Sequence, residues 1–193
     1  MKVNLVAHST PGYVPFALAP GRGIGGDLSA MDSSFKAKWG KSWQGNVSVP
    51  GAPLYEVFTL LGIDHLDLFV LDVESAELKV LQTIDFARIH IDVIATEESA
   101  FDSDPARREV ALGEINTMLA AQGFVKVSSE IILATLGSQN ALRDSTYRLP
   151  NGRERVATAW RKGRDTSTIR NIERSGFYVN SASTNPSVVR WIK

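Results

Sequence analysis

Four carboxylates follow two apolar segments of the sequence and could take part in proton transfer. Asp72 and Glu74 come directly after the apolar run Leu68 to Leu71, and Glu97 and Glu98 close the next β-branched segment. A carboxylate held beside a hydroxyl group can take its proton while the oxygen attacks, a contribution of about 10²–10⁴-fold in rate. General-base catalysis on a hydroxyl is therefore one function that these acids could serve.

The same acids also have a structural explanation, which the sequence leaves open. Negative charge near the N-terminus of a helix stabilises it by about 0.3–1 kcal/mol, and Asp72, Glu74 and Glu77 precede or begin an expected helix. Glu97 could equally be a solvated residue at the entrance to a loop. Successive strand residues point to opposite sides, so Glu97 and Glu98 cannot both face one crevice.

The middle of the chain predicts helices and strands in alternation, from the spacing of apolar residues. The expected elements are helices at Leu54–Leu61, Ser75–Asp85 and from Pro105 with Asp104 as its cap, and strands at Leu68–Leu71, Ile89–Ala95, Phe124–Val127 and Ile131–Leu136. This order predicts an α/β fold with a parallel sheet whose apolar strands are covered on both faces. Ligands bind beyond the carboxyl ends of such strands, where the acids fall.

The segment from residue 47 to residue 127 resembles the core of FkbM-type methyltransferase domains. The family pattern, an apolar strand followed by Asp-Val-Glu-Gly, corresponds to the run Asp67 to Leu81, and the family's next strand often ends in glutamate. The resemblance implies a Rossmann-like class I methyltransferase sheet, S-adenosylmethionine as methyl donor and a small-molecule or glycan hydroxyl as acceptor. With it, we expect Asp72, Glu74 and Glu97 to be the catalytic residues.

The sequence departs from the family pattern in two places. Ser75 stands where the family has glycine, a residue that allows positive φ or a close backbone approach. The strand and glycine-rich turn that hold S-adenosylmethionine in related enzymes are not evident before Val47, so we expect a sheet truncated at its N-terminal half. Gly21 to Gly26 could form a phosphate cradle, but a surface turn is the better interpretation because no helix or acid-ended strand follows. The cofactor-binding residues therefore remain unidentified.

Composition sets broader limits. The 193 residues include 21 basic and 21 acidic side chains and no cysteine, which excludes a thiolate zinc site and gives no global attraction to nucleic acid or an anionic membrane. No targeting or membrane-spanning segment is evident, so a soluble protein is expected. Three regions are predicted: an irregular segment at 1–46 rich in Gly, Pro and Ser, the methyltransferase core at 47–136, and a basic polar extension at 137–193.

The remaining candidates are weaker. His8, His65 and His90 have no ligand partner nearby in sequence, so no metal site is expected, and Asp92 could be buried and paired or face solvent. Basic residues alternate with aromatics such as Phe177 and Tyr178 near the end of the chain, a pattern that can bind RNA, but a solvated extension is the preferred explanation.

A non-catalytic function is the main alternative to the enzyme. A truncated sheet would expose a strand edge, and an unpaired edge favours pairing with another chain. The alternative is therefore an inactive relative that acts through self-association or another protein interaction.

Overall fold

The computed structural model describes residues 5–19, 25–98, 105–128, 146–148, 154–156 and 175–184. The chain divides into two compact units. The first unit comprises Met1–His65, Asp72–His90 and Ser99–Ile115, and the second comprises Leu66–Leu71, Ile91–Glu98 and Asn116–Lys193. The fold is mixed α/β, as expected. Within the described ranges, no helix has the length and apolar character needed to traverse a lipid bilayer.

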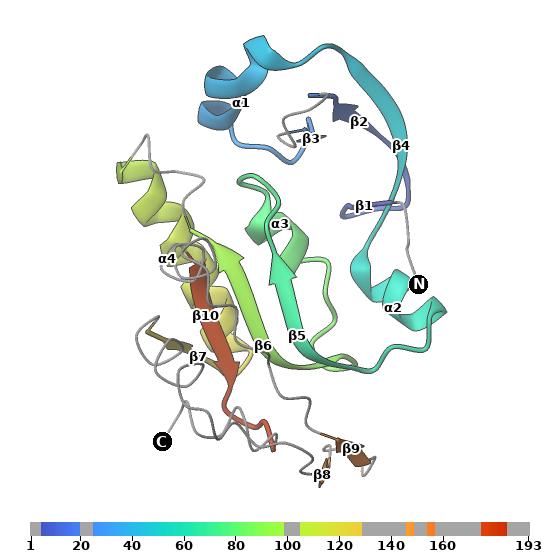
Figure 1. Ribbon diagram of the computed structural model, residues 1–193, viewed down its shortest axis with the longest axis vertical. Helices are drawn as coiled ribbons and strands as arrows, with labels where there is room; N and C mark the ends of the chain where they lie inside the picture. The colour runs from blue at the N-terminus through green and yellow to red at the C-terminus, as the bar shows by residue number, and fades with distance from the viewer. Residues whose placement is uncertain are drawn as a thin grey trace. The chain divides into compact units, whose positions relative to one another are not determined.

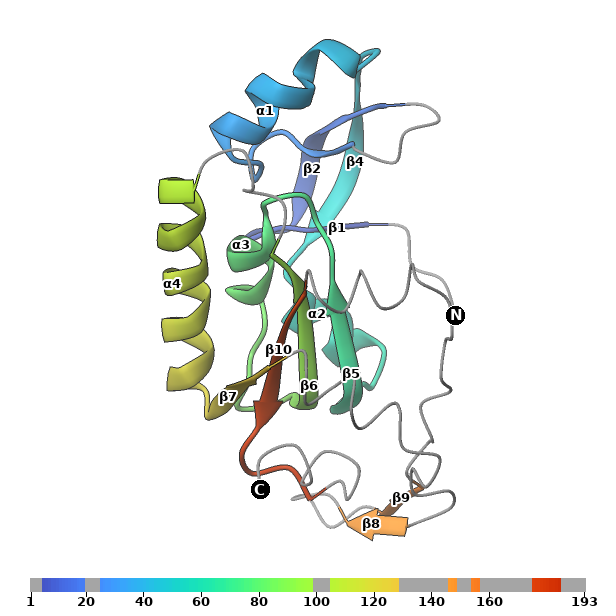
Figure 2. The ribbon, with the colours of Figure 1, turned by 60° about the vertical axis from the view of Figure 1, so that its left-hand side comes forward.

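The first unit contains a four-stranded sheet that the sequence did not predict. Its strands are β1 (Val6–Ala7), β2 (Gly12–Ala17), β3 (Gly26–Asp27) and β4 (Asn46–Ala52), in the order β1-β4-β2-β3. The β4 strand runs parallel to β1 and antiparallel to β2, and Figure 2 shows these strands near helix α1 (Ser33–Trp39), which a short 3-10 turn (Gly40–Ser42) follows. Residues 1–46 are thus not the irregular segment that we expected.

The composition of this sheet explains why its pattern was missed. Strand β2 contains Pro15 and β4 contains Pro50, residues that normally count against a strand because they donate no backbone hydrogen bond. The apolar residues are nevertheless enough for a small core, in which Val14, Met31 and Phe35 are each at most 4% exposed.

A short helix and a glycine lead out of this sheet, as the sequence predicted. Helix α2 (Leu54–Leu60) follows Pro53, and Gly62 adopts a φ of 64° just beyond its end. Glycine tolerates this left-handed conformation without steric cost, so it ends the helix readily.

The two central strands of the prediction are present and lie next to each other. Strand β5 (His65–Leu71) and strand β6 (His90–Glu97) are neighbours in a second sheet, and their arrows point the same way in Figure 1. Every residue of β6 from 91 to 96 is buried, as expected for a strand covered on both faces. In β5, however, Leu68 is 36% exposed and Val70 is 64% exposed, so the same expectation is wrong for this edge strand.

The second sheet is completed by antiparallel strands. Its order is β5-β6-β10-β7, with β7 at Phe124–Val127 and β10 at Ser175–Asn180, and β10 pairs antiparallel with both of its neighbours. The sheet is therefore mixed rather than parallel. Phe177 and Tyr178 are buried in β10, so they belong to the core and not to a solvated extension.

The last helix begins at Pro105, as predicted. Helix α4 (Pro105–Ala121) buries Ala111, Ile115 and Leu119 along one face, and Gly123 follows it with a φ of 84°. A separate two-stranded ribbon joins β8 (Thr146–Arg148) to β9 (Glu154–Val156). The expected cap Asp104 and the expected strand Ile131–Leu136 lie outside the described residues.

Candidate functional site

The chain makes an unusual turn where β5 ends. Glu74 and Ser75 have φ values of 56° and 76°, which L-residues other than glycine rarely adopt. These two conformations delay the following helix, so α3 spans Glu77–Leu81 rather than the predicted Ser75–Asp85. Glu77 is 1% exposed, and its carboxylate accepts a hydrogen bond from the Val73 N–H at 3.2 Å. Glu77 therefore holds the turn that presents the two acids before it.

Ser75 compensates for its strained backbone with a hydrogen bond. Its hydroxyl accepts from the Asp32 N–H at 3.0 Å, which ties the turn to the start of helix α1. The Asp32 carboxylate in turn caps that helix through the Ser34 N–H at 2.8 Å and pairs with the Arg107 guanidinium at 2.6 Å. Burial alone would raise the pKa of Asp32, but the hydrogen bonds from Ser34 and then Arg107 outweigh burial and lower it.

A cavity of about 330 Å³ lies beside this turn, inside the first unit. This volume falls within the range of small-molecule sites. Asp72 and Glu74 line it, Asp72 as an exposed side chain and Glu74 as a half-buried one. The other described lining residues are Leu5, Val6, Ala7, Phe16, Gly25, Gly26, Asp27, Ala30, Val73, Ala76 and Val80. The structure thus places two of the three predicted catalytic residues on one cavity.

A third carboxylate of the cavity, Asp27, was not predicted. It is 6% exposed, and its Oδ1 accepts hydrogen bonds from the Ser29 N–H at 2.7 Å and the Ser29 hydroxyl at 2.5 Å. Its Oδ2 is buried and has no hydrogen-bond partner among the described residues, since the nearest imidazole nitrogen of His8 is 4.0 Å away. A buried carboxylate oxygen without a partner is costly, and a ligand that donates a hydrogen bond would relieve that cost.

The charge of the cavity indicates which ligands it suits. Its described lining includes three carboxylates, Asp27, Asp72 and Glu74, and neither lysine, arginine nor histidine. Such a surface repels phosphate and attracts ligands with positive charge or hydroxyl donors. Gly25 and Gly26 lie at this cavity, but a Cβ on either would collide with Ala17 or Met31 of the chain itself, so internal packing explains these glycines. Gly21 and the next three residues of the proposed cradle lie outside the described residues.

The third predicted catalytic residue, Glu97, ends strand β6 as expected and is half-buried. Its neighbour Glu98 accepts a hydrogen bond from the Lys126 ammonium at 2.6 Å and a longer one from the Tyr178 hydroxyl at 3.4 Å. Burial first, and then the charge of Glu98, raise the pKa of Tyr178. These contacts belong to the second unit, and Glu97 is absent from the described lining of the cavity.

Comparison with known families decides the broader identity. The model of the methyltransferase FkbM domain matches residues 10–126, which is more than half of the chain. The protein belongs to the FkbM methyltransferase family. The match begins well before residue 47, so it includes the strands β2 to β4. No curated protein and no solved structure gives a significant match.

The residues matched by the FkbM domain therefore include the turn and all three carboxylates that line the cavity. Sequence reasoning found Asp72 and Glu74 because they follow an obvious strand. It missed Asp27 because that residue follows glycines and ends a strand of two residues, with no apolar run directly before it. The only available signal was the pair Asp27 and Ser29, whose spacing is typical of a turn in which the aspartate accepts from the backbone two residues on.

Proposed function

We propose that this FkbM domain transfers a methyl group from S-adenosylmethionine to a hydroxyl of a small molecule or glycan. The observation that carries the proposal is the cavity lined by Asp27, Asp72 and Glu74 within the residues that match the family. The parallel run of β5 and β6, which helix α3 joins along the chain, supports the proposal of a Rossmann-like sheet, because ligands bind at the carboxyl ends of such strands.

The residues of the cavity suit the methyl donor. S-adenosylmethionine carries a sulfonium, an ammonium and two ribose hydroxyls, and when bound it supplies an electrophilic methyl group. Asp27 would hold it by accepting a hydrogen bond at the buried Oδ2, where the described structure has no partner. Apolar residues of the lining, including Phe16 and Val80, provide the less polar surface that a nucleoside requires.

Asp72 is the proposed general base. Its exposed carboxylate would accept the proton of the acceptor hydroxyl. Glu74, which lines the same cavity, would orient that hydroxyl. Direct contact between a carboxylate and the sulfonium would be counterproductive, since it favours the cationic ground state over a transition state in which the charge disperses. Glu97, which does not line the described cavity, stays a prediction of the sequence as a third catalytic carboxylate.

The first experiment measures donor binding without requiring a known acceptor. Isothermal titration calorimetry of the full chain with S-adenosylmethionine should show one site, and Asp27→Asn should bind at least about tenfold more weakly, or about 1.4 kcal/mol. Asp85→Asn is the matched control, because Asp85 pairs with Arg88 at the surface and does not line the cavity. Absence of heat with the wild type at millimolar donor would reject the proposal.

A second candidate function rests on the exposure of β5. Leu68 and Val70 are exposed apolar residues on a strand that has β6 as its single described neighbour, and such an edge favours pairing with another chain. The protein would then act in an interaction rather than in catalysis. Light scattering distinguishes the two: a dimer that Val70→Lys converts to monomer, in a chain that fails to bind donor, would favour the interaction function.

A further inference from the structure

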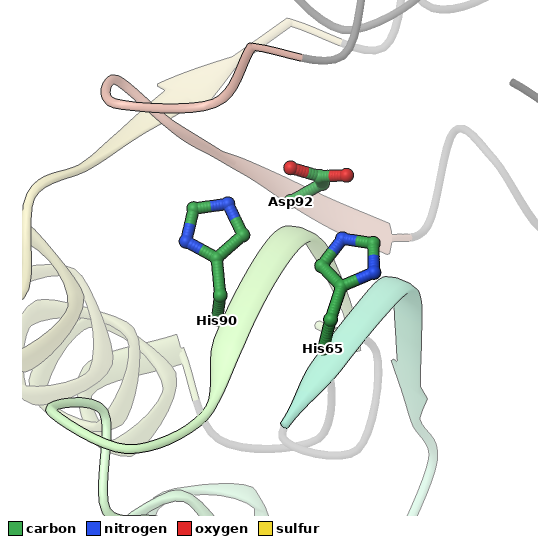
Figure 3. A group of neighbouring side chains, drawn as sticks. All are labelled: His65, His90 and Asp92. Carbon is green, nitrogen blue, oxygen red and sulfur yellow. The ribbon is translucent and has the colours of Figure 1, made fainter. Parts of the chain in front are cut away.

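Two histidines and an aspartate meet at the start of β5 and β6. His65 is the first residue of β5, His90 is the first residue of β6, and Asp92 follows two positions later. Because alternate strand residues project to the same face, His90 and Asp92 point the same way, and Figure 3 shows both imidazoles and the carboxylate gathered on one side of the two strands. One potential ligand atom from each residue lies within 4.8 Å of the other two.

The backbone holds the two histidines in place. The His90 N–H donates to the Asp64 carbonyl at 2.9 Å, so the start of β6 is fixed against the residue before His65. The two imidazole rings are stacked, with centroids 5.6 Å apart and planes inclined by 22°. This proximity follows from strand pairing, and it requires no rearrangement of the chain.

The aspartate has the outer support typical of a metal ligand. Asp92 is completely buried, and the Ser183 hydroxyl donates to its Oδ1 at 2.5 Å. The Asn180 amide donates to the Ile91 carbonyl at 3.0 Å, which supports the β6 backbone between His90 and Asp92. In metal sites, hydrogen bonds of this kind orient the side chains that coordinate the ion and increase the affinity for it.

We propose that His65, His90 and Asp92 form a site for a divalent transition metal, with Zn²⁺ as the ion that suits it best. Two imidazole nitrogens and one carboxylate oxygen are ordinary zinc ligands, whereas Ca²⁺ and Mg²⁺ prefer oxygen alone. Ligand bonds of about 2.0–2.2 Å in a tetrahedral arrangement separate the ligand atoms by about 3.3 Å. The three atoms need to approach by about 1.5 Å at most, which side-chain rotation can provide.

A bound ion would fasten the starts of β5 and β6 to each other. His90 is half-buried while the other two ligands are buried, so the ion would enter from the His90 side. The site uses none of the carboxylates assigned to the methyl donor or acceptor. It therefore stands or fails independently of the proposed function.

The test is zinc binding by the full chain after treatment with a chelator. Calorimetry should show one equivalent of Zn²⁺, and Co²⁺ should give visible bands typical of a coordinated ion. Ser183→Ala should weaken zinc binding by about 10–100-fold, and His65→Ala or His90→Ala should weaken it more. His8→Ala is the matched control, since His8 is not among the three clustered side chains, and it should bind zinc as the wild type does.

Two outcomes would overturn the site. One is a wild type that takes up no stoichiometric zinc, and the other is a His90→Ala variant that binds zinc as tightly as the wild type. If His65→Ala fails to fold, thermal unfolding of the wild type still tests the site. Zn²⁺ must raise the unfolding temperature of the wild type, and the chelator must reverse that rise.

Discussion

The carboxyl ends of β5 and β6 have similar sequences but different surroundings. Two acidic residues lie at the end of each strand: Asp72 and Glu74 follow β5, whereas Glu97 is the last residue of β6 and Glu98 follows it. After β5, Asp72 and Glu74 line a cavity, and the turn that presents them is held from behind by Glu77 and Ser75. After β6, Glu98 is paired with Lys126.

This difference shows that acidic residues after a strand are not equivalent evidence for catalysis. At the β5 end, other groups fix the backbone and leave the carboxylates directed at a cavity. At the β6 end, a carboxylate is itself one of the groups that fix the structure. The following predictions test this contrast.

Asp72→Asn tests the contrast most directly. Turnover should fall by about 10²–10⁴-fold because the amide cannot take a proton, while donor affinity and unfolding temperature stay unchanged because Asp72 is exposed. The measurement is release of S-adenosylhomocysteine with a mixture of sugar and polyol acceptors. Activity equal to that of the wild type would show that another carboxylate is the base.

Asp32→Ala tests the start of helix α1, to which the β5 turn is hydrogen-bonded through Ser75. Loss of the helix cap and of the Arg107 pair should lower the free energy of unfolding by about 1–2 kcal/mol at pH 7, measured by urea denaturation. At the β6 end, Lys126→Met should cost only about 0.2–1 kcal/mol, because that lysine is 41% exposed. A larger loss of unfolding free energy in Lys126→Met than in Asp32→Ala would contradict this comparison of the two strand ends.

The Asp32 carboxylate also predicts that the stability of the fold depends on pH. The pKa of Asp32 is lower in the folded protein than its ordinary value of 3.8, so its contribution is complete above that value and is lost as pH falls through the lowered pKa. Asp32→Asn retains the cap but cannot titrate. Its stability should therefore decline less than that of the wild type below about pH 4.

Glu97→Gln tests the β6 end in catalysis. We expect turnover to fall by no more than about tenfold, or about 1.4 kcal/mol of transition-state stabilisation, because Glu97 does not line the described cavity. The assay is the one used for Asp72→Asn. A loss as large as that of Asp72→Asn would mean that the two strand ends contribute equally.

Substitutions at Ser75 test the backbone strain at the β5 turn. Ser75→Ala keeps the positive φ and loses the hydrogen bond from Asp32, so it should lower stability by about 1 kcal/mol. Ser75→Gly loses the same bond but relieves the backbone, so it should unfold close to the wild-type temperature. Equal destabilisation by both substitutions would contradict the presence of strain.

The sequence predicts best where local pattern and tertiary structure agree. The runs that became β5, β6 and α4 carry enough apolar residues to identify their types and to place Asp72, Glu74 and Glu97 at strand ends. The pattern could not show that β5 is an edge strand, because burial depends on which strands pair. Positive φ at Glu74 also left no local signal, although the glycine expected by the family at Ser75 pointed to it.

Contacts between distant residues were beyond the reach of the pattern. His65 and His90 are 25 positions apart, so their types and spacing do not indicate that they are neighbours, yet strand pairing brings them together with Asp92. Asp27 was overlooked for a similar reason, since its importance comes from a cavity shared with residues some 45 positions later. Such clusters depend on topology, which local composition does not encode.

The position of β10 has a consequence for synthesis of the protein. This strand lies between β6 and β7, and Tyr178 pairs with Ile94 on one side and Lys126 on the other. A nascent chain that has reached residue 128 on the ribosome holds both flanking strands but lacks the one that joins them. The sheet cannot close until about fifty more residues emerge, and the hydrophobic surface exposed in the meantime is of the kind that favours aggregation.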